Sequence, residues 1–191
     1  PYRGFTYKAE GPLDLRMNPG QGISAAERLC HITKEELKGM LMENSDEPYA
    51  EEIASEVTGR LRKGEEIATT TQLYQAVEGA LSFLPGKEQK EAVKKASQRN
   101  FQALRIDVNT EFEALYAFMA KLPEVLAPNG RAAGLTFHLG EDRLVKKAFK
   151  KFYREGLYSE ISGEIIRPAR GESVKNSRAR STKMRWAVRA G

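Results

Sequence analysis

The sequence predicts an α/β protein in which an all-helical unit precedes the closing part of a sheet. Two observations predict this. Residues 23–84 combine helix-start signals with apolar residues spaced three and four apart, and no strand pattern interrupts them. After residue 98 the order changes to helix, strand, helix, strand, strand, which is the end of an α/β sheet without its beginning.

The composition narrows the class of protein. Of 191 residues, 40% are hydrophobic, which permits a sizeable core. No apolar run approaches the roughly 20 residues of a membrane span, and residues 1–11 lack the apolar core of a signal peptide. One cysteine and two histidines exclude an internal disulfide and provide no zinc-ligand spacing. We therefore expect a soluble protein without a membrane partner or metal.

Residues 1–22 are rich in glycine and proline and predict an extended segment. Two possible capping boxes follow. Ser24 opens a helix to about His31, and Thr33 opens a second to about Asn44.

Two further helices complete the helical unit. Asp46 is expected to cap a helix that ends before Gly64, and Thr69 or Thr71 starts another that ends at Pro85. Residues 86–100 are polar and basic, and predict either a loop or a short solvated helix.

The second half is expected to contain two helices and three strands. An apolar stripe predicts one long helix over about 98–122, and residues 141–154 predict the second, with Leu144, Ala148 and Phe152 inward. The strands are expected at 131–137, 164–168 and 184–188, with a basic loop at 173–183.

The stretch NPGQGISAAE, residues 18–27, contains G-x-G-x-x-A, a pattern found in dinucleotide-binding loops. That loop needs a buried strand before it and another after its helix. Here Asp14 and Arg16 interrupt the preceding apolar residues, and a second helix follows. The context favours a glycine turn before a capped helix over a cofactor loop.

FHLGEDR, residues 137–143, lies where a strand is expected to end and a helix to begin. Ligands bind at such edges of open α/β sheets, so His138 is a candidate for proton transfer or hydrogen bonding. Arg143 could bind a phosphate or brace the carboxylates of Glu141 and Asp142 in the first turn. The alternative is an ordinary helix cap, because carboxylates are favoured in a first turn. Arg105 and Asn109 share one helical face, either reaching a polar pocket or forming a polar shoulder.

Positive charge is concentrated at the C-terminal end. Residues 141–191 contain 14 Lys and Arg against 6 Asp and Glu, a net +8, whereas residues 1–140 carry 17 against 20, a net −3. This asymmetry indicates either nucleic-acid binding or a solvated surface. Three aromatic residues are candidates for base stacking or for the core: Tyr153, Tyr158 and Trp186.

Several stretches together resemble the MraW/RsmH family of S-adenosylmethionine-dependent methyltransferases, which act on the exocyclic N4 of a cytosine in small-subunit ribosomal RNA. The similar stretches occur in the family's order: RGFTYKAEGPLDLRMNP (3–19), GISAAE (22–27), NFQALRIDVNTEFEAL (100–115), LAPNGRAAGLTFHLGEDRLVKKAF (126–149), and more weakly IIRP with NSRARSTKMRWA (176–187). The family usually reads S-F-H-S-L-E-D-R where this chain has Leu139 and Gly140 in place of the second Ser and the Leu.

The resemblance implies the C-terminal part of a Rossmann-like methyltransferase core with an inserted all-helical domain. Residues 1–22 would lead out of the core, 23–97 would form the insert for RNA recognition, and 98–191 would return to the core with a basic tail. The residues that hold S-adenosylmethionine are expected upstream of this chain, so none is assigned here.

The resemblance also suggests roles for individual residues. Asn109, His138 and Glu141 are the catalytic candidates. Ten cations are expected to bind the RNA: Arg105, Arg143, Lys146, Lys147, Lys150, Lys151, Arg178, Arg180, Lys183 and Arg185.

Three functions therefore stand. The first is part of a ribosomal RNA cytosine-N4 methyltransferase, with the isolated chain expected to be inactive. The second is a non-catalytic RNA- or ribosome-binding protein, and the third is a structural helical module. The expected partner is small-subunit ribosomal RNA, with a homodimer as a further candidate, in a bacterial cytoplasm or an organelle.

Overall fold

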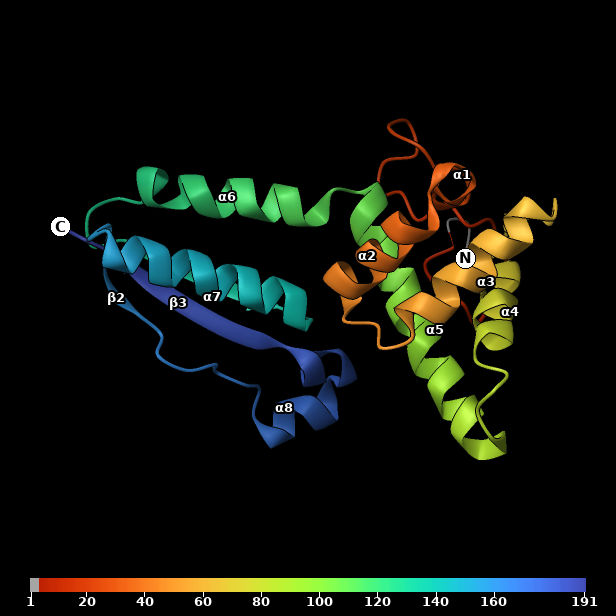
Figure 1. The fold of residues 1–191 in the computed structure, drawn as a ribbon. Helices are drawn as coiled ribbons and strands as arrows, with labels where there is room; N and C mark the ends of the chain where they lie inside the picture. The colour runs from red at the N-terminus through yellow and green to blue at the C-terminus, as the bar shows by residue number, and fades with distance from the viewer. Residues whose placement is uncertain (1–3) are drawn as a thin grey trace. The chain divides into compact units, whose positions relative to one another are not determined.

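The computed structural model describes residues 4–191, so the first three residues of the predicted 1–22 segment lie outside the described part (Figure 1). The chain divides into two compact units, Pro1–Glu111 and Phe112–Gly191, and each is described by itself. No helix among the described residues is long and apolar enough to cross a membrane.

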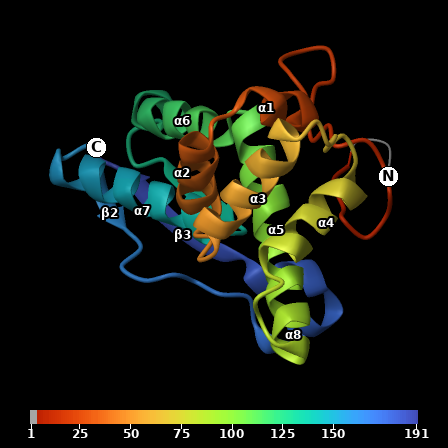
Figure 2. The same ribbon diagram turned by 45° about the vertical axis from the view of Figure 1, so that its right-hand side comes forward.

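Unit 1 is helical, as predicted. It contains α1 (Ala25–His31), α2 (Lys34–Ser45), α3 (Ala50–Arg62), α4 (Thr70–Ala80) and α5 (Gly86–Val108). Helix α5 contacts α1, α2 and α4, and Figure 2 shows it running through the unit. The preceding extended segment joins the core through Leu13 and Leu15, which are both fully buried.

Three of the predicted helix starts are confirmed, and one is wrong. The Oγ of Ser24 accepts a hydrogen bond from the backbone N–H of Glu27, and complete capping boxes form at Thr33 and at Thr69. Asp46 does not start α3. It lies in the left-handed region, φ 52°, and ends α2, because its N–H donates to the last-turn carbonyls of that helix.

The predicted single helix over 98–122 is wrong, because two helices share that stretch. Helix α5 begins at Gly86 and ends at Val108, and α6 (Glu111–Val125) follows. Asn109 donates from its side chain to the carbonyl oxygen of Arg105, and Thr110 has φ 47°, which breaks the helical path.

Unit 2 packs two helices with a three-stranded antiparallel sheet (Figure 1). The sheet has the order β1-β3-β2, with β1 (Arg131–Thr136), β2 (Tyr158–Ile161) and β3 (Lys183–Arg189). Helix α7 (Leu139–Arg154) connects β1 to β2 and contacts all three strands. Before β3, the chain forms α8 (Arg170–Lys175) and the 3₁₀ helix η1 (Ser177–Ser181).

The strands at 131–137 and 184–188 are confirmed, but the strand at 164–168 is wrong. That stretch makes only an isolated bridge between Ile166 and Met184, while the second edge strand, β2, lies at 158–161. The bulge in β2 between Tyr158 and Glu160 disturbs the two-residue alternation that identifies a strand in a sequence. The basic stretch 173–183, predicted as a loop, contains α8 and η1 residues.

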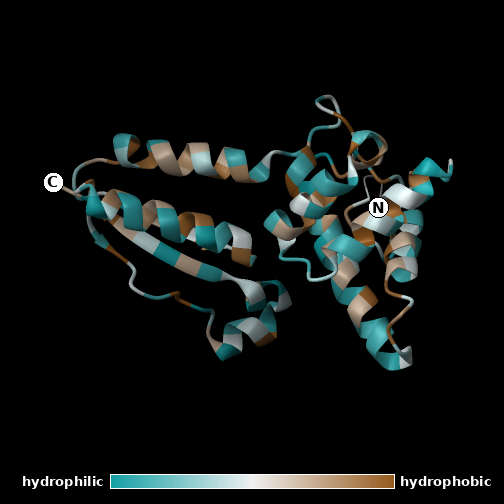
Figure 3. Cartoon of the chain, in the orientation of Figure 1, coloured by the Kyte–Doolittle hydropathy of each residue, from teal (hydrophilic) through white to brown (hydrophobic). Residues whose placement is uncertain are grey.

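The core of unit 2 lies between the sheet and its helices. Val145 and Phe149 of α7 are buried with Met119 of α6 and Tyr158 of β2. Leu144, Ala148 and Phe152, which were predicted to face inward from α7, are half-buried and pack against this core. Figure 3 shows α6 as largely apolar and α7 as alternating between polar and apolar residues.

Candidate functional site

The junction between β1 and α7 places His138 and Glu141 in direct contact. His138 is the N-cap of α7, and its Nδ1 accepts a hydrogen bond from the backbone N–H of Glu141 at 3.4 Å. In return, Oε2 of Glu141 accepts from the N–H of Phe137 at 2.8 Å and from that of His138 at 3.4 Å. The pair forms a capping box with histidine in the place usually taken by serine or threonine.

The carboxylate of Glu141 is strongly stabilised by this arrangement. Burial raises the pKa of Glu141, but the His138 side chain and the N–H of Phe137 favour the charged form more, and the resulting pKa is about 2. Glu141 is therefore fully ionised at neutral pH. A carboxylate of such low pKa is a weak proton acceptor, so its arrangement suits positioning better than general-base catalysis.

The two nitrogens of the His138 ring face different groups of Glu141. Since Nδ1 accepts a hydrogen bond, the proton of the neutral imidazole belongs on Nε2. Nε2 is buried 3.4 Å from Oε1 of Glu141, and it makes no hydrogen bond among the described residues. Nε2 is thus enclosed within the junction and faces the carboxylate of Glu141.

Gly140 makes room for an aromatic ring beside His138. The rings of Phe112 and His138 have centroids 5.8 Å apart. A Cβ atom on Gly140 would lie 2.5 Å from the tip of the Phe112 ring. Gly140, which replaces the family's usual Leu, therefore permits a close contact between Phe112 and the first turn of α7.

A buried ion pair connects the same turn to the sheet. Arg185 of β3 donates from Nε and Nη2 to the two carboxylate oxygens of Asp142, at 2.8 and 3.1 Å. The side chains are only 6% and 8% exposed. The sequence does not indicate this pair, because 43 positions separate the two residues. Side chains alternate between the two faces of β3, and Lys183 and Arg185 lie on the same face as the buried Ala187. This alternation was the sequence signal that could have indicated their burial.

The predicted RNA-binding cations of unit 2 fall into two groups. The exposed group follows α7 and η1: Arg143, Lys146, Lys147, Lys150, Lys151, Arg178 and Arg180. The buried group is Lys183 and Arg185. Lys183 donates to the carbonyl oxygen of Ser181, and Arg185 is held by Asp142, so we omit both from the proposed RNA surface.

Asn109 and Arg105 belong to unit 1. The side chain of Asn109 joins the end of α5 to the extended segment: Nδ2 donates to the carbonyl oxygen of Leu15, and Oδ1 accepts from the N–H of Met17, both at 2.7 Å. Arg105 makes a two-point ion pair with Glu111, at 2.8 and 3.1 Å. Arg105 also borders a hollow of about 280 Å³ beside Tyr7 and Phe101.

The glycine stretch 18–27 does not fit a cofactor loop. Between residues 4 and 17 the chain forms only an isolated bridge at Pro12 and no strand, and the seven-residue α1 follows the glycine stretch. The Oγ of Ser24 is engaged by the N–H of Glu27, and Oδ1 of Asn18 accepts from the N–H of Gly20. This arrangement confirms the interpretation as a turn before a capped helix.

Comparison with known proteins supports the family resemblance that the motif at the β1–α7 junction indicated. The model of the MraW methylase family matches residues 1–190. The chain belongs to the MraW methylase family. The match includes both units and all the residues discussed above.

Named relatives support this assignment. The chain is 63% identical over 190 residues to ribosomal RNA small subunit methyltransferase H 1 of Agathobacter rectalis, covering 100% of the chain and 54% of that relative. It is 60% identical to the protein of the same name from Lachnoclostridium phytofermentans, with 100% and 52% covered. A Synechococcus relative, ribosomal RNA small subunit methyltransferase H, is 39% identical, with 100% and 56% covered. The chain spans about half the length of these relatives.

Proposed function

We propose that this chain is part of an enzyme that uses S-adenosylmethionine to methylate the N4 atom of a cytosine in small-subunit ribosomal RNA. The observation that supports this proposal is the family match over residues 1–190, together with relatives named as ribosomal RNA small subunit methyltransferases. In the full-length protein, this chain would contribute the C-terminal part of a Rossmann-like core and an inserted helical domain.

The glycine stretch at residues 18–27 would not hold the methyl donor, because it starts α1. What the chain contributes is placement of the base. Methyl transfer to an amino nitrogen depends on in-line alignment, and small displacements of the reacting atom are costly.

The three catalytic candidates take different roles in this proposal. His138 would shape the pocket for the base, because it lies where β1 ends and α7 begins. Glu141 would fix the imidazole through the capping box, and Asn109 would fix the segment at residues 15–17. Glu141 and Asn109 are thus positioning residues. Arg143 of unit 2 would organise the His138 site or bind phosphate, and Arg105 of unit 1 would bind phosphate on its own unit.

The test is methylation by the full-length protein. Small ribosomal subunits that lack the modification are incubated with the protein and labelled donor, and nucleosides are analysed by mass spectrometry. We expect N4-methylcytidine, and His138→Ala should lower kcat by about 100-fold. Leu139→Ser, which restores the family's usual residue at an exposed position, is the matched control and should retain activity.

The alternative is a non-catalytic RNA-binding protein, which the exposed cations of α7 and η1 would also serve. RNA binding by the full-length protein without N4-methylcytidine would support this alternative and overturn the proposal. Product formation that is unchanged in His138→Ala would leave the enzyme assignment in place but remove His138 from the site.

A further inference from the structure

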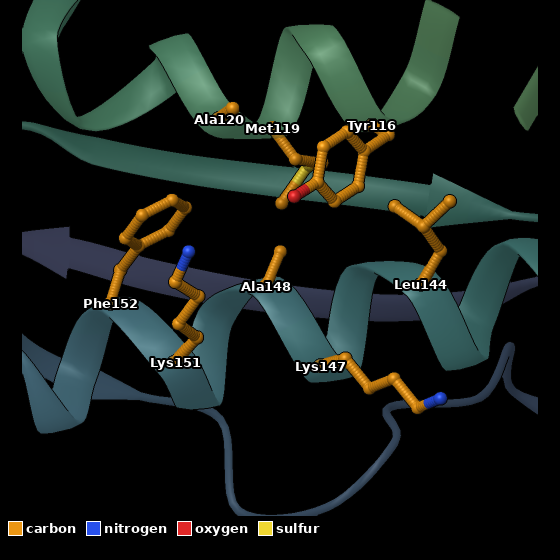
Figure 4. Close-up of a pocket in the computed structure, with 8 residues that line it drawn as sticks. All are labelled: Tyr116, Met119, Ala120, Leu144, Lys147, Ala148, Lys151 and Phe152. Carbon is orange, nitrogen blue, oxygen red and sulfur yellow. The ribbon is translucent and has the colours of Figure 1, made fainter. Parts of the chain in front are cut away.

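Helices α6 and α7 enclose an apolar groove that the β1–α7 junction does not use. The groove has a volume of about 270 Å³. Tyr116 and Met119 of α6 line it opposite Leu144 and Phe152 of α7. Figure 4 shows the Tyr116 ring and the Met119 sulfur facing Ala148 across the groove. An open, aromatic-lined groove of this size is large enough for a planar ring.

Lysine side chains border this groove. The ammonium group of Lys151 lies 5.3 Å from the centre of the Phe152 ring, and Figure 4 shows it pointing to the groove side. Lys147, one turn before Lys151 in α7, also lines the groove. Tyr116 is 63% exposed, so its ring is available to a ligand.

A second hollow adjoins the groove along α7. It has a volume of about 400 Å³ and shares Lys147 and Lys151 with the groove, and Lys150, Arg154 and Glu155 complete it. Among the described residues, no carboxylate forms an ion pair with these four cations. The two acidic residues within α7, Glu141 and Asp142, are both engaged at its first turn. The hollow therefore carries four cations against the single carboxylate of Glu155, which leaves a net positive charge.

We propose that this face binds a single-stranded RNA segment, with one base in the α6–α7 groove and the neighbouring phosphates on the α7 lysines. Single-stranded nucleic acid is recognised by aromatic side chains that stack on bases and by cations that follow the backbone. The two adjoining hollows provide both features and share two lysines. This subsite is separate from the His138 site, and it rests on the proposed function only in naming the strand as ribosomal RNA.

The binding experiment uses the 191-residue chain and a fluorescent 12-nucleotide single-stranded RNA, with anisotropy measured over a range of salt concentrations. Tyr116→Ala should weaken binding by about fivefold or more, because stacking on that ring is lost. Its salt dependence should not change, since no charge is removed. Tyr116→Phe retains the aromatic face and should bind as the parent chain does.

Removal of the shared lysines should change the salt dependence instead. For single strands, each phosphate contact contributes about 0.7 to the slope of log K against log salt, so Lys147→Ala/Lys151→Ala should reduce the slope by about 1.4. Lys121→Ala is the matched control, because this exposed lysine of α6 lines neither hollow. An abasic strand of equal length should bind the parent chain and Tyr116→Ala equally.

Three results would overturn the subsite. They are unchanged affinity in Tyr116→Ala, a slope in the lysine double variant no smaller than in Lys121→Ala, and tighter binding of an acidic aromatic peptide than of RNA of equal charge. The last result would indicate a protein partner.

Failure of the subsite and failure of the proposed function are distinguishable. In the full-length enzyme, Tyr116→Ala should raise the KM for RNA and leave kcat unchanged. If methylation occurs with an unchanged KM, the subsite is wrong and the function stands. If the chain binds RNA as described but the full-length protein forms no N4-methylcytidine, the function is wrong and the subsite stands.

Discussion

Replacing Asp142 with alanine should destabilise unit 2 by several kcal/mol. The change removes both hydrogen-bond acceptors of Arg185, at 2.8 and 3.1 Å, while the guanidinium stays at a site that is 6% exposed. Removing one partner of a buried ion pair costs about 3–5 kcal/mol, because an uncompensated charge is left behind. A unit of about 80 residues has a total stability of about 4–12 kcal/mol, so this loss is a large fraction of it.

The assay is urea unfolding followed by the fluorescence of Trp186. It is the single tryptophan of the chain, it lies beside Arg185 in β3, and it therefore reports on unit 2. With a slope of about 2 kcal/mol per molar urea, a loss of 3 kcal/mol lowers the midpoint by about 1.5 M. Asp142→Leu/Arg185→Met is the matched control, because replacing both partners with apolar residues removes the unpaired charge and should restore most of the stability.

Two results would refute this reasoning. One is a midpoint for Asp142→Ala within about 0.2 M of the parent chain, which would correspond to the small contribution of an exposed pair. The other is a double variant no more stable than Asp142→Ala alone, because the loss would then not come from the unpaired guanidinium.

Three further predictions concern single side chains. The pKa of Glu141 is about 2, below its value of 4.5 in the unfolded chain, so its contribution to stability is complete above pH 4.5 and is lost as the pH falls towards 2. The difference in urea midpoint between the parent and Glu141→Gln should therefore shrink as the pH falls over that range. A constant difference would contradict the prediction. Tyr158→Phe should leave stability unchanged or raise it by up to about 1 kcal/mol, because the buried hydroxyl has no hydrogen-bond partner among the described residues. A loss of more than about 1 kcal/mol in thermal unfolding would show that the hydroxyl does make a hydrogen bond. Asn109→Ala should cost about 1–3 kcal/mol, because it removes the side-chain hydrogen bonds to the N–H of Met17 and to the carbonyl oxygen of Leu15. The Met17 amide should exchange its hydrogen faster, and unchanged exchange would exclude this role.

Local patterns in the sequence were sufficient for features that depend on near neighbours. The helix starts at Ser24, Thr33 and Thr69 were predictable because a capping side chain bonds a backbone N–H three residues away. Strands β1 and β3 were predictable because their apolar runs are bounded by turn residues and polar stretches. The family resemblance was likewise readable from contiguous motifs, and the family match confirms it.

Features that depend on distant residues were decided only by the tertiary structure. Asn109 ends α5, and its side chain bonds residues 15–17, more than 90 positions away. Arg185 looked like a cation for RNA, but Asp142 lies against it and both are buried. The groove beside Tyr116 likewise forms only where α6 and α7, which β1 separates in the sequence, lie side by side. The sequence alone determined which side chains carry charge, whereas folding decided which charges are paired and which stay exposed, because only packing brings distant carboxylates and cations within bonding distance.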